Sequence, residues 1–203
     1  MISLTMHIIY ANKGEYMLNN KANIINALML ANEKEVSEGK LWYLKARNRC
    51  KDIAKRTNTP FIKVVGMFSA LSPACPIDKN FKDVENLIKD SNHKCTTYEA
   101  NRDKAEKIYH LDKPSNKEIL KILNGQKTTR FFLNIYSHKY KVITIDRHAI
   151  SLYFGTFDHK FIQTPKRIKK IREDYKEVAN EFGLRAYQLQ AITWLVWKRV
   201  NNI

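Results

Sequence analysis

The chain has 203 residues, 44% of them hydrophobic, which suffices for one domain with a sizeable core and excludes a disordered protein. Its 36 lysines and arginines against 20 acidic residues give a net charge of +16, which favours a polyanionic partner over a basic surface that only keeps the chain in solution. Three widely spaced cysteines exclude a disulfide framework and a CxxC metal site, and no uncharged run is long enough to span a membrane.

Helices are expected along almost the whole chain, because only 6 glycines and 5 prolines interrupt it. In the first half, apolar residues recur at helical spacing. Thr59-Pro60 predicts a helix with a threonine cap and a proline at its first position, and Pro73 and Pro76 mark a loop. The helices predicted there cover 17–30, 40–55, 60–71, 78–89 and 98–109.

The second half has clearer end signals. Ser115 and Glu118 form a capping box that begins the first helix of a hairpin, and Gly125 is expected to end that helix. Asp146 is expected to cap a short helix that Gly155 closes. The segments predicted are helices over 127–136, 147–154 and 186–200, a helix from the Thr164-Pro165 cap to Phe182 before Gly183, and a short extended piece over 140–145.

No internal repeat, low-complexity segment or linker divides the sequence. We therefore expect an all-α chain that forms a single helical domain over 1–203, with 1–38 as an N-terminal extension packed on it. Residues 1–10 have neither the basic start nor the cleavage site of a signal peptide, and the cysteine content fits a reducing compartment. A cytoplasmic location is therefore expected.

One lysine and one aspartate are notable because each begins a predicted helix. Lys127 lies in the segment Leu-Asn-Gly-Gln-Lys-Thr-Thr over 123–129, and Asp146 follows 19 residues later in Val-Ile-Thr-Ile-Asp-Arg-His over 142–148. A carboxylate can stabilise positive charge on a sugar, and an unprotonated amine can attack its C1′, so the pair suits chemistry at an anomeric carbon. The plain alternatives are a helix cap for Asp146 and a solvated side chain for Lys127.

These residues resemble the helix-hairpin-helix (HhH-GPD) DNA glycosylases, whose hairpin has roughly the sequence Leu-Pro-Gly-Val-Gly-Arg-Lys-Thr-Ala and whose catalytic aspartate lies in Val-Asp-Thr-His. The resemblance implies an all-α, helix-hairpin-helix glycosylase-like fold. In it Lys127 matches the Schiff-base lysine of the bifunctional members, Asp146 the aspartate of nearly all members, and His148 the histidine two residues on. The hairpin of this chain has one glycine, Gly125, where the family usually has two.

A second segment, Ala-Leu-Ser-Pro over 70–73 followed by Asn80, resembles phage-encoded relatives of the glycosylases, including the proposed α-glutamyl/putrescinyl thymine pyrophosphorylases. The resemblance covers 39–155. The resemblance and the charge pattern together predict a set of substrate- or DNA-binding residues beside the catalytic pair, with no metal ligand among them. They are Ser72, Asn80, Gly125, Gln126, Arg130, Asn134, Arg147, His148, Lys166, Arg167, Lys169 and Lys170.

The expected function is that of a DNA glycosylase-like enzyme acting on a flipped-out, modified pyrimidine base in a phage context, and thus in the host cytoplasm. One alternative is a thymine hypermodification enzyme that displaces pyrophosphate from a hydroxymethyl base with an amine or amino acid. A second is a catalytically inactive DNA-binding or inhibitory protein. DNA is the expected partner, with no membrane and a monomer favoured. The chain has no cysteine after Cys95, so we expect no iron-sulfur cluster, and a monovalent cation at the hairpin is the one ion that the resemblance allows.

Overall fold

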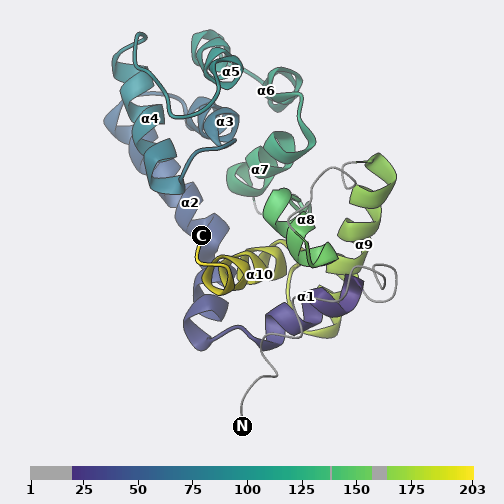
Figure 1. The fold of residues 1–203 in the computed structure, drawn as a ribbon. Helices are drawn as coiled ribbons and strands as arrows, with labels where there is room; N and C mark the ends of the chain where they lie inside the picture. The colour runs from purple at the N-terminus through teal and green to yellow at the C-terminus, as the bar shows by residue number, and fades with distance from the viewer. Residues whose placement is uncertain (1–19, 138, 157–163) are drawn as a thin grey trace. The chain divides into compact units, whose positions relative to one another are not determined.

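The computed structural model describes residues 20–137, 139–156 and 164–203. Over these residues the regular secondary structure consists of helices alone, joined by turns and irregular segments (Figure 1). The all-α prediction is confirmed for this part of the chain. None of these helices has the length and apolar character that a membrane crossing requires. The helices are α1 (Asn20–Met29), α2 (Glu33–Arg56), α3 (Phe61–Leu71), α4 (Ile77–Lys89), α5 (Glu99–His110), α6 (Asn116–Leu123), α7 (Gln126–Tyr136), α8 (Arg147–Phe154), α9 (Pro165–Glu181) and α10 (Ala186–Val200).

Contacts group the chain into two compact units, and each is described by itself. The central unit is Tyr43–Tyr140, and the terminal unit consists of the described residues of Met1–Trp42 and Lys141–Ile203. The residues of α2 are divided between the two units. The single domain with an N-terminal extension over 1–38 stays a prediction. Residues 1–19 of that extension lie outside the described residues, and these include residue 17, where the first helix was predicted to begin.

The core of the central unit is α3, whose residues from Val64 to Leu71 are all buried. A helix that is apolar on every side needs neighbours all around it, and α3 packs against α4, α5, α6 and α7. Gly66 permits the close approach of two of these helices. A Cβ at that position would lie 2.9 Å from Ile108 of α5 and 3.2 Å from Ile119 of α6.

Aromatic rings from four helices continue this core. Phe68 of α3 stacks on Phe81 of α4 with ring centres 4.2 Å apart and on Phe131 of α7 at 5.6 Å. Tyr43 of α2 meets Phe131 edge-on, and the Arg49 guanidinium covers the outer ring, 3.8 Å from the centre of Phe81. Such contacts fix the spacing of the helices beyond what area burial supplies.

In the terminal unit, α1, α8, α9 and α10 pack around Tyr175, which is fully buried. The Tyr175 hydroxyl shares a hydrogen bond of 3.1 Å with Thr193. The buried carboxylate of Asp174 accepts from the Tyr153 hydroxyl at 2.5 Å and from Lys170 Nζ at 2.6 Å. These partners offset the cost of removing a charge from water.

An ion pair links the start of α2 to the end of α10. Glu35 accepts from Arg199 Nε at 2.7 Å and from the backbone N–H of Asn32 at 3.0 Å. Burial tends to raise the pKa of Glu35, but the hydrogen bonds from Arg199 and Asn32 outweigh it and lower that pKa below its ordinary value.

Most predicted end signals are confirmed. Ser115 and Glu118 form the capping box of α6, and Thr164 caps α9. Asp146 Oδ1 accepts the Ala149 N–H at 2.9 Å at the start of α8, which ends at Gly155 with a φ of 65°.

Two local predictions were wrong. Pro60 is the N-cap of α3, so Thr59 lies one residue too early to cap it. Asn124, with a φ of 51°, is the left-handed residue that ends α6, and Gly125 is instead the N-cap of α7. The segment 140–145 pairs with no strand among the described residues, and the short extended piece expected there stays a prediction.

Candidate functional site

The hairpin between α6 and α7 turns over two residues only. Asn124 takes the left-handed conformation and Gly125 starts α7 without a side chain to cap it. The Thr128 hydroxyl bonds back to the Leu123 and Gly125 carbonyls, and Thr129 Oγ1 donates to Gly125 at 2.7 Å. The beginning of α7 therefore carries a partial positive charge that the N-cap side chain does not compensate, as a phosphate-binding helix start requires.

The Leu123 carbonyl, at the end of α6, also accepts from Lys104 Nζ at 3.2 Å. The Lys104 ammonium from α5 thus supplies positive charge at that carbonyl. The monovalent ion expected at the hairpin stays a prediction.

The predicted residues of α7 share one face, because they lie three and four positions apart. Lys127 is half-buried, Arg130 is partly buried, and Asn134 is only 6% exposed. Burial lowers the pKa of the Arg130 guanidinium. Lys127 and Arg130 thus place two positive charges on this face, while Gln126 beside them is exposed.

Asp146 is held at the start of α8 by the chain on both sides of it. Ile143, Thr144 and Ile145 are all buried in the terminal unit, and the aspartate caps the helix that follows. Its side chain remains partly exposed. A carboxylate at a helix start interacts favourably with the helix dipole, and a carboxylate can stabilise positive charge that develops nearby.

An aromatic group lies in the same unit, and only its member His148 was among the contact residues predicted from the sequence. His148 of α8 meets the Trp194 ring of α10 edge-on at 6.5 Å, and Trp42 meets Trp194 at 6.2 Å. Lys198 Nζ lies 4.8 Å from the centre of Trp194. Both tryptophans are partly exposed. Trp42, His148, Trp194 and Lys198, called here the Trp194 cluster, combine aromatic rings with the positive charge of Lys198, and His148 lies two residues after Asp146 in sequence. Such a surface can stack a nucleobase.

Lys127 belongs to the central unit and Asp146 to the terminal unit. Each is described within its own unit, and their meeting in one cleft stays a prediction.

Two predicted contact residues in the central unit have structural partners. Ser72 follows α3, and its hydroxyl donates to the Ser69 carbonyl at 2.9 Å. Asn80 is 1% exposed, and its Nδ2 donates to the Phe68 carbonyl at 2.9 Å, while its Oδ1 has no hydrogen-bond partner among the described residues. The amide of Asn80 joins α4 to α3, and its predicted contact with a base remains untested.

The basic cluster lies in the first turns of α9, after Thr164. Lys166, Arg167, Lys169 and Lys170 are all exposed. Lys170 pairs with Asp174 at 2.6 Å and Lys169 approaches Glu173 at 3.9 Å. The helix dipole disfavours positive charge at a helix start, and the first turn of α9 contains no acidic residue. The basic residues therefore reduce the stability of α9 somewhat. Arg147 is likewise exposed at the start of α8.

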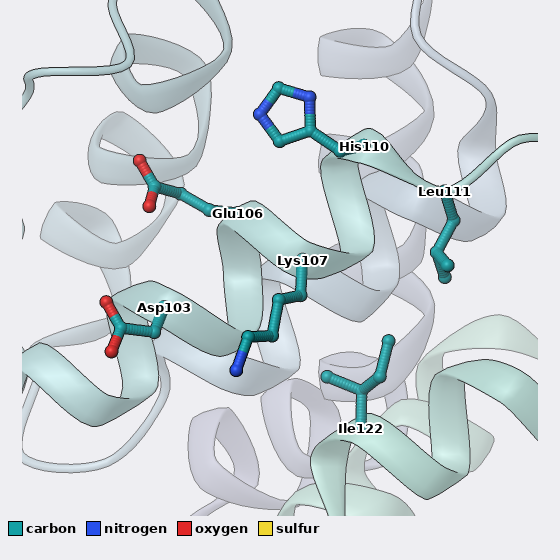
Figure 2. Close-up of a pocket in the computed structure, with 6 residues that line it drawn as sticks. All are labelled: Asp103, Glu106, Lys107, His110, Leu111 and Ile122. Atoms are coloured by element: carbon teal, nitrogen blue, oxygen red, sulfur yellow. The ribbon is translucent and has the colours of Figure 1, made fainter.

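An open pocket of about 660 Å³ lies elsewhere in the central unit, along α5 (Figure 2). Its charged lining comes from that one helix. None of the predicted site residues lines it. The lining residues are Asp103, Glu106, Lys107, His110, Leu111 and Ile122.

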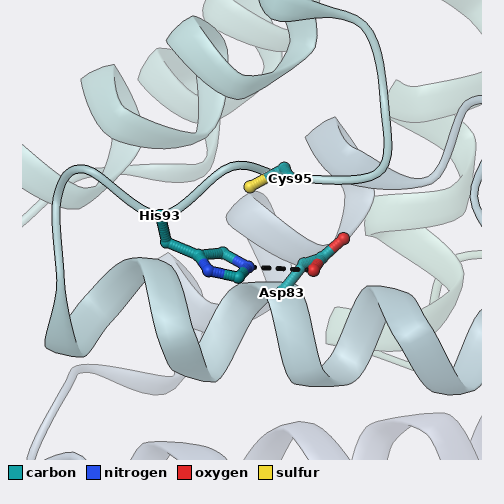
Figure 3. A group of neighbouring side chains, drawn as sticks. All are labelled: Asp83, His93 and Cys95. Atoms are coloured by element: carbon teal, nitrogen blue, oxygen red, sulfur yellow. Dashed lines mark hydrogen bonds and ion pairs between the residues drawn. The ribbon is translucent and has the colours of Figure 1, made fainter.

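The structure also gathers Asp83, His93 and Cys95 in the central unit (Figure 3). The sequence analysis predicted no metal ligands and did not connect these residues. The signal that could have indicated them is the His-x-Cys spacing at 93–95, which alone is weak.

No curated protein matches the chain, and no solved structure matches it. A family model does match, over residues 6–201, and it describes a family of unknown function, DUF7178. Because this match covers nearly the whole sequence, the chain belongs to the family of unknown function DUF7178.

Proposed function

We propose that this protein is a DNA glycosylase-like enzyme that acts on a flipped-out, modified pyrimidine base in DNA. The observation that carries the proposal is the order of local structures over 123–148. A tight hairpin leads into a helix with Lys127 in its first turn, and the chain then reaches Asp146 at the start of α8. This order is the one that the resemblance to the helix-hairpin-helix glycosylases implies.

In the proposed reaction, Asp146 stabilises the positive charge that develops on the sugar as the N-glycosidic bond breaks, or activates the attacking group. Lys127 either attacks C1′ or holds the carboxylate charged. A base within a duplex must leave the stack to be reached, and the Trp194 cluster offers a surface that can stack an extruded base.

Mass spectrometry of nucleosides tests the proposal directly. The protein is incubated with DNA that contains modified thymines or cytosines, and the products are compared with those from the Asp146→Asn variant. A free base supports glycosylase action. An intact but altered nucleoside overturns base excision and supports the hypermodification alternative, for which Lys127 and Arg130 would bind the leaving pyrophosphate. Unchanged nucleosides with DNA bound support the inactive DNA-binding alternative.

Binding to DNA is expected to depend steeply on salt. Each phosphate that a basic side chain neutralises contributes about 0.9 to the slope of log Kd against log salt concentration. The triple variant Lys166→Gln, Arg167→Gln, Lys169→Gln should therefore have a slope that is smaller by up to about 2.7. Lys170 is left in place because it pairs with the buried Asp174. Removing positive charge from the start of α9 should leave thermal stability unchanged or slightly higher.

The matched control removes the same charge from α2, with Lys34→Gln, Lys45→Gln and Lys51→Gln, all at exposed positions. Fluorescence anisotropy at several salt concentrations measures both slopes. Equal slopes for the two triple variants would show that α9 contributes only to the general field of the protein.

If Lys127 attacks C1′ rather than holding the carboxylate charged, it forms a Schiff base on a reactive substrate. Only an unprotonated amine attacks, and the dipole at the start of α7 together with Arg130 one turn on disfavours an added positive charge there. Borohydride should then trap a covalent protein–DNA adduct that Lys127→Gln abolishes and Lys121→Gln retains. No adduct on a substrate that the protein does turn over, with Lys127→Gln fully active, would leave Lys127 as a structural or phosphate-binding residue.

A further inference from the structure

Three side chains capable of binding a transition metal meet beside α4 in the central unit. Asp83 lies in the middle of α4, and His93 and Cys95 lie in the segment 90–98 that joins α4 to α5 (Figure 3). His93 Nε2 is 3.0 Å from Asp83 Oδ1, and one ligand atom from each of the three residues lies within 4.8 Å of the others. Among the described residues, no other three such side chains converge in this way.

A fourth side chain reaches the same carboxylate from the turn between α3 and α4. Cys75 Sγ is 3.8 Å from Asp83 Oδ2, so this thiol lies next to the group of three. The chain has three cysteines, and two of them are here, while Cys50 is fully buried in the core. Carboxylate, imidazole and thiol groups therefore come together from three separate segments.

Two distances within the cluster are close to those expected for tetrahedral zinc. Zinc binds oxygen and nitrogen at about 2.0–2.1 Å and sulfur at about 2.3 Å, so its ligand atoms lie roughly 3.3–3.8 Å from one another. The distances of 3.0 Å and 3.8 Å measured from Asp83 differ from this range by at most a few tenths of an ångström.

Hydrogen bonds outside the cluster hold its members in place. The Thr96 N–H donates to Asp83 Oδ2 at 2.8 Å, and Arg102 Nε donates to the His93 carbonyl at 3.0 Å. Thr97 Oγ1 donates to the Pro73 carbonyl at 2.6 Å, which ties the segment 90–98 to the turn that carries Cys75. Outer hydrogen bonds of this kind orient the ligands of metal sites.

We propose that Cys75, Asp83, His93 and Cys95 bind one zinc ion, which closes the segment 90–98 onto α4. The site is structural, because all four tetrahedral positions are filled by the protein. Two thiol protons leave to solvent as the two zinc–sulfur bonds form, and His93 binds as the neutral imidazole. The inference concerns the central unit alone and does not depend on the proposed activity.

The opposing explanation is a metal-free anchor, in which Asp83 holds the segment through Thr96 and His93 only. In that case the thiols stay protonated, since burial first and the charge of Asp83 second raise the pKa of Cys95 to about 11. The two explanations differ in whether the cysteines matter to the segment and in whether a divalent ion binds.

The test uses the full chain, reduced, stripped with a chelator and then titrated with zinc against a chromophoric competitor. We expect one zinc per chain and a thermal midpoint that rises by several degrees on saturation. Cobalt in place of zinc should give a thiolate-to-cobalt charge-transfer band. His93→Ala and Cys95→Ser should each weaken zinc binding at least about 100-fold, because the loss of an outer hydrogen bond alone costs about 10- to 100-fold. Cys75→Ser should weaken it as well.

The controls are Cys50→Ala, which removes the thiol outside the cluster, and His110→Ala, which removes an exposed histidine of α5. Both should bind zinc as the wild type does. Cobalt binding by the wild type without the thiolate band overturns the proposal, whether or not the variants fold. So does a stripped wild-type chain that takes up no zinc at micromolar concentration, or equal affinity in the His93, Cys95 and control variants.

Discussion

Asp146→Asn is expected to keep the fold and to lose at least about two orders of magnitude in the rate of base release, the range typical for an acid–base or charge-stabilising group. The amide oxygen of asparagine can still accept the Ala149 N–H that Asp146 Oδ1 accepts at 2.9 Å, so α8 keeps its cap. The neutral amide cannot stabilise positive charge on a sugar. Single-turnover kinetics on the substrate found by nucleoside analysis measures the rate, and thermal unfolding measures the stability.

Two further variants separate the cap from the chemistry. Asp146→Ala removes both and should also cost about 1 kcal/mol of stability. Ser115→Ala removes the cap of α6, with a similar loss of stability and no loss of turnover. Turnover of Asp146→Asn equal to that of the wild type would mean that Asp146 is only a helix cap.

The ends of the helices could be predicted from the sequence where one side chain determines them locally. The reciprocal hydrogen bonds of Ser115 and Glu118 join residues three apart, and the cap of Asp146 on Ala149 spans the same distance. Gly155 closes α8 through its own positive φ. These features need no partner from another part of the chain, so the pattern of residues is sufficient.

The hairpin turn shows where that reasoning stops. Two neighbouring residues, Asn124 and Gly125, can both leave the right-handed region, and the sequence favoured the glycine. The structure gives the positive φ to Asn124, and Gly125 starts the next helix with a φ of −113°. The choice depends on where Thr128 and Thr129 bond back to the turn, which residue preferences alone do not determine.

The candidate site could be predicted only in part, because much of it depends on distant contacts. Trp194 lies 152 positions after Trp42, and only the packing of α10 beside α2 brings their rings within 6.2 Å. Asp83 meets Cys75 and His93 through the turns at both ends of α4. Asn80 has a sequence context typical of a contact residue, yet its position on α4 directs its amide to the Phe68 carbonyl in the core.

Gly39→Ala is expected to lower the stability of the terminal unit by about 2 kcal/mol. A Cβ at Gly39 would lie 2.4 Å from Ile192 Cγ1 and 2.7 Å from both the Cα and the N of Ile192. Alanine in the middle of a helix gains about 1 kcal/mol over glycine. Overpacking costs about 1–3 kcal/mol or more, and the upper end applies because two of the three contacts are with backbone that no rotamer change can move.

Two comparisons isolate the clash from helix propensity. Ser37→Ala changes an exposed position of the same helix and should be neutral or slightly stabilising. Ile192→Ala destabilises the protein by itself, because Ile192 is fully buried. It removes the Cγ1 contact but leaves the two backbone contacts, so in the Ile192→Ala background Gly39→Ala should cost less than in the wild type but still cost stability. For a chain of this size, thermal unfolding should show a midpoint lower by roughly 4–8 °C for Gly39→Ala. A midpoint at or above that of the wild type would mean that helix propensity outweighs the contact and that α2 and α10 do not approach as closely as described.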